Sequence, residues 1–138
     1  MREYAAMTPR VLFLVLLGAA ACVPKRDLPP AEIEKLPSLE QVMDVQATVA
    51  DPQFGKIDKA SYDDQDWAAF ADMGSRLQVT SNKSKQFSKG PEFDAFADQL
   101  HAKAEALSTA ASAKDAKAAS DALAQIKATC KSCHSKFR

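Results

Sequence analysis

The chain has 138 residues, and its 18 Lys and Arg balance its 18 Asp and Glu, so the formal net charge is zero. This balance argues against a nucleic-acid-binding protein, because such proteins carry basic patches. If the first 21 residues are a leader, 138 − 21 = 117 residues remain. That length is close to the usual size of one domain.

The first 21 residues have the pattern of a secretory signal peptide. Arg2 and Arg10 make the start basic, residues 11–17 form an unbroken apolar run, and residues 18–21 are Gly and Ala. A basic start, a short apolar stretch and small residues are the three parts of such a leader. The apolar run is too short to cross a bilayer, which takes about 20 residues. We therefore predict residues 1–21 to be a signal peptide and the protein to be periplasmic.

Cys22 directly follows the expected cleavage point. Residues 17–22, Leu-Gly-Ala-Ala-Ala-Cys, resemble a bacterial lipobox, although Ala19 stands where Leu is preferred. An unpaired cysteine in an exported protein needs an explanation, so we predict that Cys22 is lipidated and is the only attachment to a membrane. The alternative is an ordinary signal peptide that ends beside a cysteine. Residues 22–37 hold four prolines and no apolar periodicity, which predicts an irregular tether.

Residues 38–138 carry apolar side chains at helical spacing, with no strand-like alternation. Ser38 followed by Gln41 is a capping-box start, and Pro52 is expected to end or kink the first helix. A second helix is expected from residues 61–64, a loop over 82–90, and two more helices divided by a turn at 113–115. The expected buried stripes are Leu39, Val42, Met43, Val49 and Ala50; Trp67, Phe70, Ala71, Gly74 and Leu77; Phe93, Phe96, Leu100, Ala104, Leu107 and Ala111; and Ala119, Leu123, Ile126, Cys130, Cys133 and Phe137.

These four amphipathic segments predict an all-α fold, an antiparallel up-down-up-down four-helix bundle. The last of them contains Cys130-Lys131-Ser132-Cys133-His134, and Cys-x-x-Cys-His is the attachment signature of c-type haem. On a helix, cysteines three residues apart place both sulfurs on one face, where they can form thioethers to the two vinyl groups of one porphyrin. His134 can then bind the iron. We predict one covalent haem c in the bundle.

Other uses of the motif fit less well. A redox Cys-x-x-Cys normally lies in a βαβ pattern, which this sequence lacks. A structural zinc site takes four ligands, and His101 and Cys22 are the only Cys or His residues outside the motif. A disulfide between Cys130 and Cys133 would not require His134.

The ending Cys-Lys-Ser-Cys-His-Ser-Lys-Phe-Arg on a fourth helix resembles the cytochrome c′ family, the class II c-type cytochromes. The resemblance extends over residues 38–138, although only the terminal motif is specific. It implies that haem lies inside the bundle, that Cys130 and Cys133 are its thioether anchors, and that His134 is the proximal iron ligand. It also implies that the distal side of the haem faces the first helix.

The resemblance leaves the sixth iron position open between two branches of the family. In one branch a first-helix methionine binds the iron, and Val42-Met43-Asp44 followed by Pro52 resembles that first helix. Met43 is therefore the expected sixth ligand, and Met73 and His101 are weaker alternatives. In the other branch the iron is five-coordinate, and Met43, Ala47 and Ala50 would line an open distal side.

The first branch makes the protein a monohaem electron carrier with His/Met ligation that serves a redox partner protein. The second makes it a high-spin protein that binds or buffers nitric oxide or carbon monoxide. A third possibility is a structural haem subunit of a larger complex. No catalytic constellation is present, so we do not expect an enzyme. The resemblance also implies that a homodimer is possible.

Overall fold

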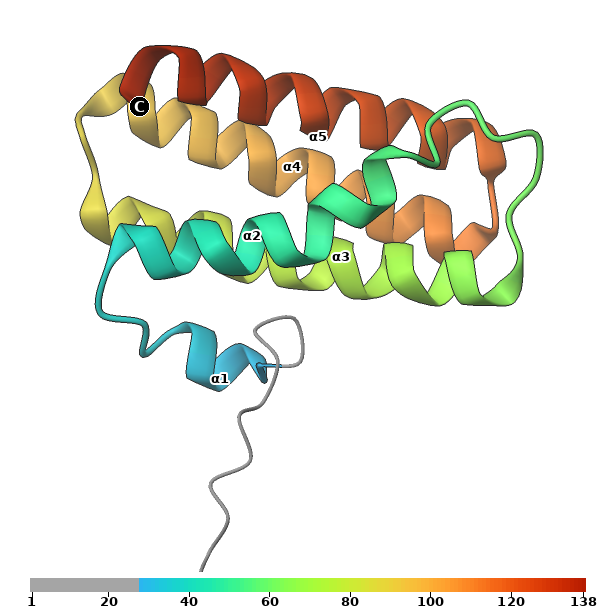
Figure 1. Ribbon diagram of the computed structural model, residues 1–138, viewed down its shortest axis with the longest axis horizontal. Coiled ribbons are helices and arrows are strands. Elements are labelled where there is room, and N and C mark those ends of the chain that lie inside the picture. The colour runs from blue at the N-terminus through green and yellow to red at the C-terminus, as the bar shows by residue number, and fades with distance from the viewer. Residues whose placement is uncertain (1–27) are drawn as a thin grey trace, which may run out of the picture.

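A computed structural model describes residues 28–138, and in these residues the only regular secondary structure is helical. Four long helices form the body: α2 (Leu39–Phe54), α3 (Asp64–Ser84), α4 (Pro91–Ala113) and α5 (Ala116–Phe137). Successive helices run in opposite directions, and each packs beside the next (Figure 1). The predicted all-α, up-down-up-down four-helix bundle is therefore confirmed. Within the described chain, no helix combines the length and the apolar character that a membrane span requires.

The helix ends follow the capping residues of the sequence. Ser38 Oγ accepts a hydrogen bond from the Gln41 amide at 3.3 Å and starts α2. Pro52 lies inside the last turn of α2, which ends two residues later at Phe54, so this proline marks the helix end without preceding it. Pro91 occupies the first turn of α4, where its missing N–H costs no intrahelical hydrogen bond. Lys114 adopts the left-handed conformation that closes α4.

The loop expected over residues 82–90 is shorter than predicted. Helix α3 continues to Ser84, and a 3₁₀ turn, η2 (Lys85–Phe87), follows it. The reason is tertiary: Lys83 is buried, and its ammonium group donates to Glu34 O at 2.6 Å and to Gln86 Oε1 at 2.8 Å. The polar residues at the end of α3 therefore include a buried side chain with hydrogen-bond partners, and they do not form a solvated loop.

The predicted signal peptide (residues 1–21) and Cys22 lie outside the described residues, but the end of the expected irregular tether does not. Residues Pro30–Ile33 form a short helix, α1, which packs on α3. Ile33 is completely buried. This part of the lead-in is therefore ordered against the bundle, contrary to the expectation from its prolines.

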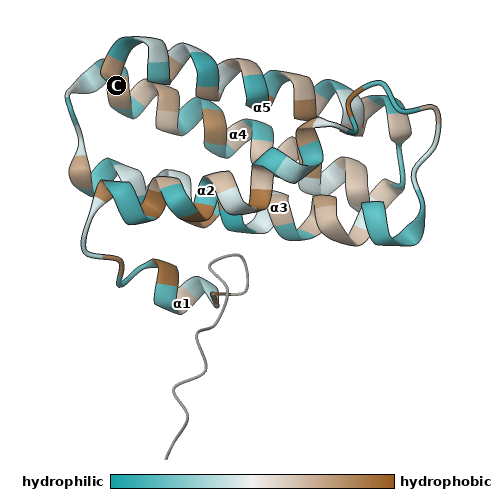
Figure 2. Cartoon of the chain, in the orientation of Figure 1, coloured by the Kyte–Doolittle hydropathy of each residue, from teal (hydrophilic) through white to brown (hydrophobic). Residues whose placement is uncertain are grey.

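Every long helix contributes buried apolar residues to the core, and apolar and polar residues alternate along each helix (Figure 2). At the end where α3 begins, Tyr62, Trp67 and Phe70 pack edge to face. Ala71, expected in the buried stripe, is exposed, and Met73 is fully buried in its place. The stripe therefore follows Trp67, Phe70, Met73 and Leu77, which is the helical period.

Helices α3 and α4 approach each other closely at Gly74. A Cβ added there would overlap Ser108 Oγ and lie 2.9 Å from the carbonyl oxygen of Ala104. Because that carbonyl is fixed in a helix, Gly74→Ala is expected to lower the free energy of unfolding by about 1–3 kcal/mol. The control is Gly55→Ala, where nothing lies within 4 Å. Denaturant unfolding of both variants measures the two free energies of unfolding. Equal values would contradict the prediction and show that α4 shifts away from α3 to make room for the added Cβ.

Asp66 joins the loop before α3 to the helix itself. Its side chain is 7% exposed. The carboxylate lies 2.8 Å from Lys56 Nζ and 2.6 Å from Lys59 Nζ, and it accepts a hydrogen bond from the backbone N–H of Asp63. Hydrogen bonds from the two lysines hold the pKa of Asp66 well below its usual range. At neutral pH, Asp66→Asn is expected to cost roughly 1–3 kcal/mol.

The pH dependence of this contribution has a definite sign. A carboxyl whose pKa is lower in the folded protein stabilises the fold above the unfolded pKa of about 4, and the stabilisation is lost as the pH falls further. The stability gap between the wild type and Asp66→Asn should therefore be constant near neutrality and shrink below about pH 4. Thermal melts of both proteins, recorded near neutral pH and again below about pH 4, measure this stability gap. Asp121→Asn, which removes an exposed pair with Lys117, should show almost no gap.

Candidate functional site

Cys130, Cys133 and His134 lie in the last two turns of α5, and all three are half-buried. Cys130 packs against the hydrophobic core, and both cysteines are free thiols. The sequence-predicted spacing is thus realised on a continuous helix, with the sulfurs three residues apart on the side that faces the bundle.

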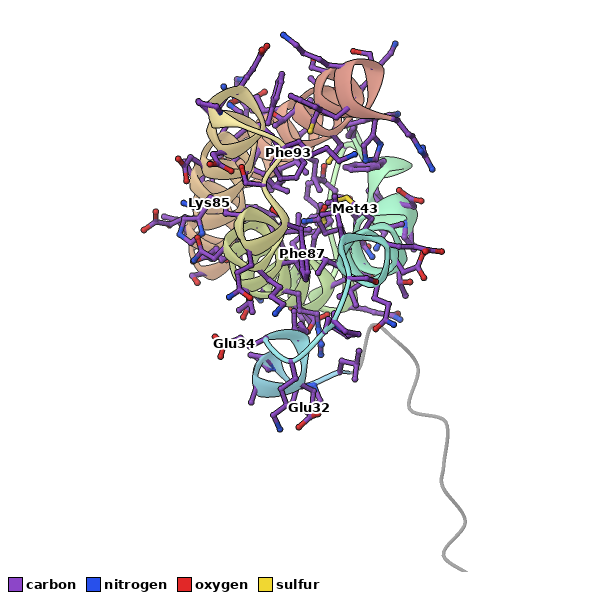
Figure 3. The ribbon with its side chains drawn as sticks, turned by 90° about the vertical axis from the view of Figure 1, so that its left-hand side faces the viewer. Glu32, Glu34, Met43, Lys85, Phe87 and Phe93 are labelled. Atoms are coloured by element: carbon purple, nitrogen blue, oxygen red, sulfur yellow. The ribbon has the colours of Figure 1, made fainter. Side chains whose placement is uncertain are left out.

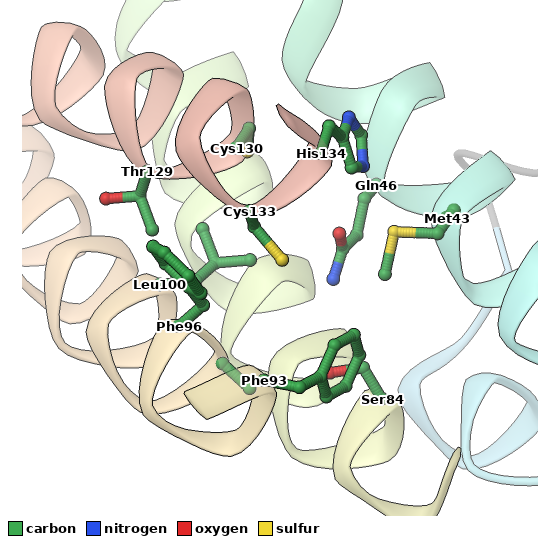
Figure 4. A pocket seen from close by; sticks show the side chains of 11 residues that line it. Met43, Gln46, Ser84, Phe93, Phe96, Leu100, Thr129, Cys130, Cys133 and His134 are labelled. Atoms are coloured by element: carbon green, nitrogen blue, oxygen red, sulfur yellow. The ribbon is translucent and has the colours of Figure 1, made fainter. Parts of the chain in front are cut away.

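A cavity of about 30 Å³ lies between these residues and the other three long helices (Figure 4). Its walls are mostly apolar. They comprise Met43, Gln46, Ser84, Phe93, Phe96, Ala97, Leu100, Thr129, Cys130, Cys133 and His134. A more open hollow of about 190 Å³ adjoins it and shares Met43, Phe93, Cys133 and His134. These four side chains therefore stand between the interior and the bundle end.

The position of Met43 depends on the arrangement of the helices. Helix α2 packs on α3, α3 on α4 and α4 on α5, whereas the contact between α2 and α5 is the loosest of these four. Met43 on α2 and His134 on α5 line the same cavity beside this loosest contact. Viewed down the bundle, Met43 and Phe93 project into the interior, while Lys85 projects outward (Figure 3). The structure thus brings Met43 to the same cavity as the haem motif; its ligation of iron stays a prediction.

Burial sets the protonation of the motif. It raises the pKa of the Cys130 thiol to about 11 and also raises the pKa of Cys133, so both are protonated thiols at neutral pH. Burial, assisted by the Arg138 charge, lowers the pKa of His134. The imidazole is therefore neutral at pH 7, which is the form that binds a metal.

The two weaker candidates for the sixth ligand lie elsewhere. Met73 is fully buried in the hydrophobic core and does not line the cavity. His101 is half-buried in a separate groove between α3 and α4, where its Nδ1 lies 3.1 Å from Gln78 O and 3.3 Å from Ser81 Oγ. Neither residue faces Cys130, Cys133 or His134.

The expected lining of the distal side was wrong at two positions. Ala47 is exposed, and Ala50 is buried in the core outside the cavity. Gln46, which the sequence reasoning missed, takes their place: it is three residues after Met43 on the same face of α2 and only 7% exposed. Gln46 is polar, so apolar periodicity does not identify it. Its spacing of three residues from Met43 does indicate that the two share a helix face.

These residues fit a c-type haem. Two protonated thiols at the correct spacing can each add across a vinyl double bond, the neutral imidazole of His134 can bind iron, and Phe93, Phe96 and Leu100 provide an apolar wall. The side-chain nitrogen of Gln46 is buried without a hydrogen-bond partner in the described part of the chain. An orphaned donor in a largely apolar cavity indicates that a further group belongs there.

The comparisons agree with this assignment. No curated protein and no solved structure matches the chain. A sequence model of the family described as Cytochrome C′ matches residues 38–138, the whole bundle and the terminal motif. Family members bind one covalent haem c, are typically periplasmic, and generally serve as electron carriers or gas-binding proteins. Because the match covers well over half of the chain, this protein belongs to the cytochrome c′ family.

Proposed function

We propose that this protein is an exported, monohaem electron carrier in which His134 and Met43 are the axial ligands of the iron. The observation that carries the proposal is the position of Met43. It lines the same cavity as Cys133 and His134, but it comes from α2, whereas they come from α5. A histidine and a thioether on two facing helices are suited to bind one iron from its two sides.

The haem would supply a one-electron ferric/ferrous couple. In the proposal, Cys130 and Cys133 anchor the porphyrin to α5, and His134 binds the iron from the same helix. Phe93, Phe96 and Leu100 exclude water, and the low dielectric that results favours the thioether of Met43 over a solvent ligand. Because these side chains sit on packed helices, they would keep their positions in both redox states.

The cellular setting belongs to the same proposal. Residues 1–21 direct export to the periplasm, Cys22 carries a lipid, and residues 22–37 connect the anchor to the bundle. The electron is passed to a redox partner protein, and the protein itself is not an enzyme. Mass spectrometry of the native N-terminus tests the anchor: the expected form begins at a lipidated Cys22, and a free N-terminus or an uncleaved chain would contradict it.

One observation favours gas binding as a second candidate. Met43 is only half-buried and also lines the more open hollow at the bundle end. If Met43 did not hold the iron, a small ligand would have a short route to the sixth position.

The absorption spectrum of the reduced holoprotein, recorded before and after carbon monoxide is added, separates these two functions. The protein is produced in a host that attaches haem c. We expect sharp low-spin bands that carbon monoxide leaves unchanged. A broad high-spin spectrum that shifts with carbon monoxide would contradict the electron-carrier proposal and support gas binding.

A further inference from the structure

Gln46 differs from Ser84 and Thr129, the two hydroxyl-bearing residues of the cavity. Ser84 Oγ donates to Ser81 O at 2.7 Å, and Thr129 Oγ1 donates to Gln125 O at 2.9 Å, so both hydroxyl protons are used within their own helices. The Gln46 side-chain nitrogen, by contrast, has no acceptor among residues 28–138. The Gln46 side chain is more than nine-tenths buried and points into the cavity, between Cys133 and Met43 in Figure 4.

The cavity offers few acceptors for this amide. Phe93, Phe96, Ala97 and Leu100 have none. The remaining candidates are the hydroxyl oxygens of Ser84 on α3 and Thr129 on α5, the sulfurs of the two cysteines and of Met43, and His134. The cysteines and His134 belong to α5, whereas Gln46 and Met43 are neighbours on one face of α2, three residues apart. Among these candidates, the Met43 sulfur is the one carried by α2 itself, one turn before Gln46.

Resting on the proposed ligation by Met43, we propose that the Gln46 amide donates a hydrogen bond to the iron-bound sulfur of Met43 and thereby sets the reduction potential of the haem. A thioether sulfur bound to iron keeps a second lone pair, which can accept such a bond. Hydrogen bonds to an axial ligand are one of the means by which a protein tunes a haem. Gln46 is thus a positioning residue.

The sign of the effect follows from the electron demand of the iron. A donor on the sulfur withdraws electron density from it, and the ferric iron, which is poorer in electrons, loses more from this than the ferrous iron. The hydrogen bond therefore favours the ferrous state and raises the potential. If the whole net worth of one neutral hydrogen bond were lost in the ferric state, the equilibrium between the two states would change by about fivefold, which is the largest effect expected. For a one-electron couple, this is about 40 mV.

The test compares the holoprotein with Gln46→Leu, which removes the donor and keeps a similar volume. Spectroelectrochemical titration should give a lower potential in Gln46→Leu, by at most about 40 mV, with the spectrum still low-spin. The matched control is Gln53→Leu, because Gln53 is on the same helix, has a buried unpaired side-chain oxygen and does not line the cavity. Its potential should equal that of the wild type. Equal potentials for Gln46→Leu and Gln53→Leu would overturn the proposal.

A double-mutant cycle with Met43→Leu identifies the acceptor. If the amide acts through the sulfur, Gln46→Leu no longer changes the potential once Met43 is leucine. A change that persists in full would place the acceptor elsewhere, for example on a haem propionate, and would overturn the proposal while leaving Met43 ligation intact. A wild-type protein that is already high-spin would refute the electron-carrier function itself, and with it this hydrogen bond. The two failures are therefore distinguishable.

Discussion

Replacing Met43 with alanine is expected to convert the low-spin holoprotein into a high-spin form that binds carbon monoxide. The alanine side chain has no donor atom, and the cavity beside it is lined largely by apolar groups, so the iron is left with His134 alone. If the sulfur keeps the open form at about 1% of the wild type, the variant should bind carbon monoxide about 100-fold more tightly. Absorption spectra and a carbon monoxide titration of the ferrous protein measure both effects.

The matched control is Met73→Ala. Met73 is the other methionine of the described chain, and it is fully buried in the core away from the cavity. Its truncation should lower the free energy of unfolding by roughly 2–5 kcal/mol without altering the spin state. An unchanged low-spin spectrum in Met43→Ala, or a high-spin spectrum in Met73→Ala, would show that the ligand has been assigned to the wrong residue.

The second large effect is expected when Cys130 and Cys133 are both replaced by serine. Each thiol is expected to add its S–H across one vinyl double bond, so that a C–S bond forms and the hydrogen goes to the neighbouring carbon. Without either sulfur, the haem is held only by its axial ligands and by the apolar wall. Acidified organic solvent should extract all of the haem from the double variant and none from the wild type.

Cys22→Ser is the control for this experiment, because it removes the third cysteine of the chain and leaves the motif intact. Denaturing mass spectrometry should find the haem mass added to Cys22→Ser and absent from the double variant. Haem that stays covalently attached when both Cys130 and Cys133 are serine would contradict the assigned anchors.

The fold was largely predictable from local signals. Ser38, Pro91 and the turn at Lys114 mark helix ends by properties of the residues themselves, and the structure uses each of them. The terminal motif was predictable for the same reason: the helical period alone brings Cys130 and Cys133 to one face. Such features depend on neighbours in sequence, which a sequence displays directly.

The features that were missed depend on residues distant in sequence. The extension of α3 over Lys83 requires an acceptor from Glu34, 49 residues earlier, and Ile33 is buried only because α1 meets α3. Gln46 was overlooked because polar residues are normally assigned to the solvent face. Its burial becomes intelligible only when the cavity, and the group that belongs there, are known.

The most direct test of His134/Met43 ligation is the proton–carbon NMR spectrum of the ferrous holoprotein with its methionine methyl groups labelled with carbon-13. A methyl group bound through its sulfur to the iron lies over the porphyrin plane, where the ring current shifts its resonance strongly upfield. Met73→Leu assigns the two methionine signals of the bundle. We expect the Met43 methyl far upfield and the Met73 methyl in the ordinary range. Both methyl resonances in the ordinary range would contradict ligation by Met43.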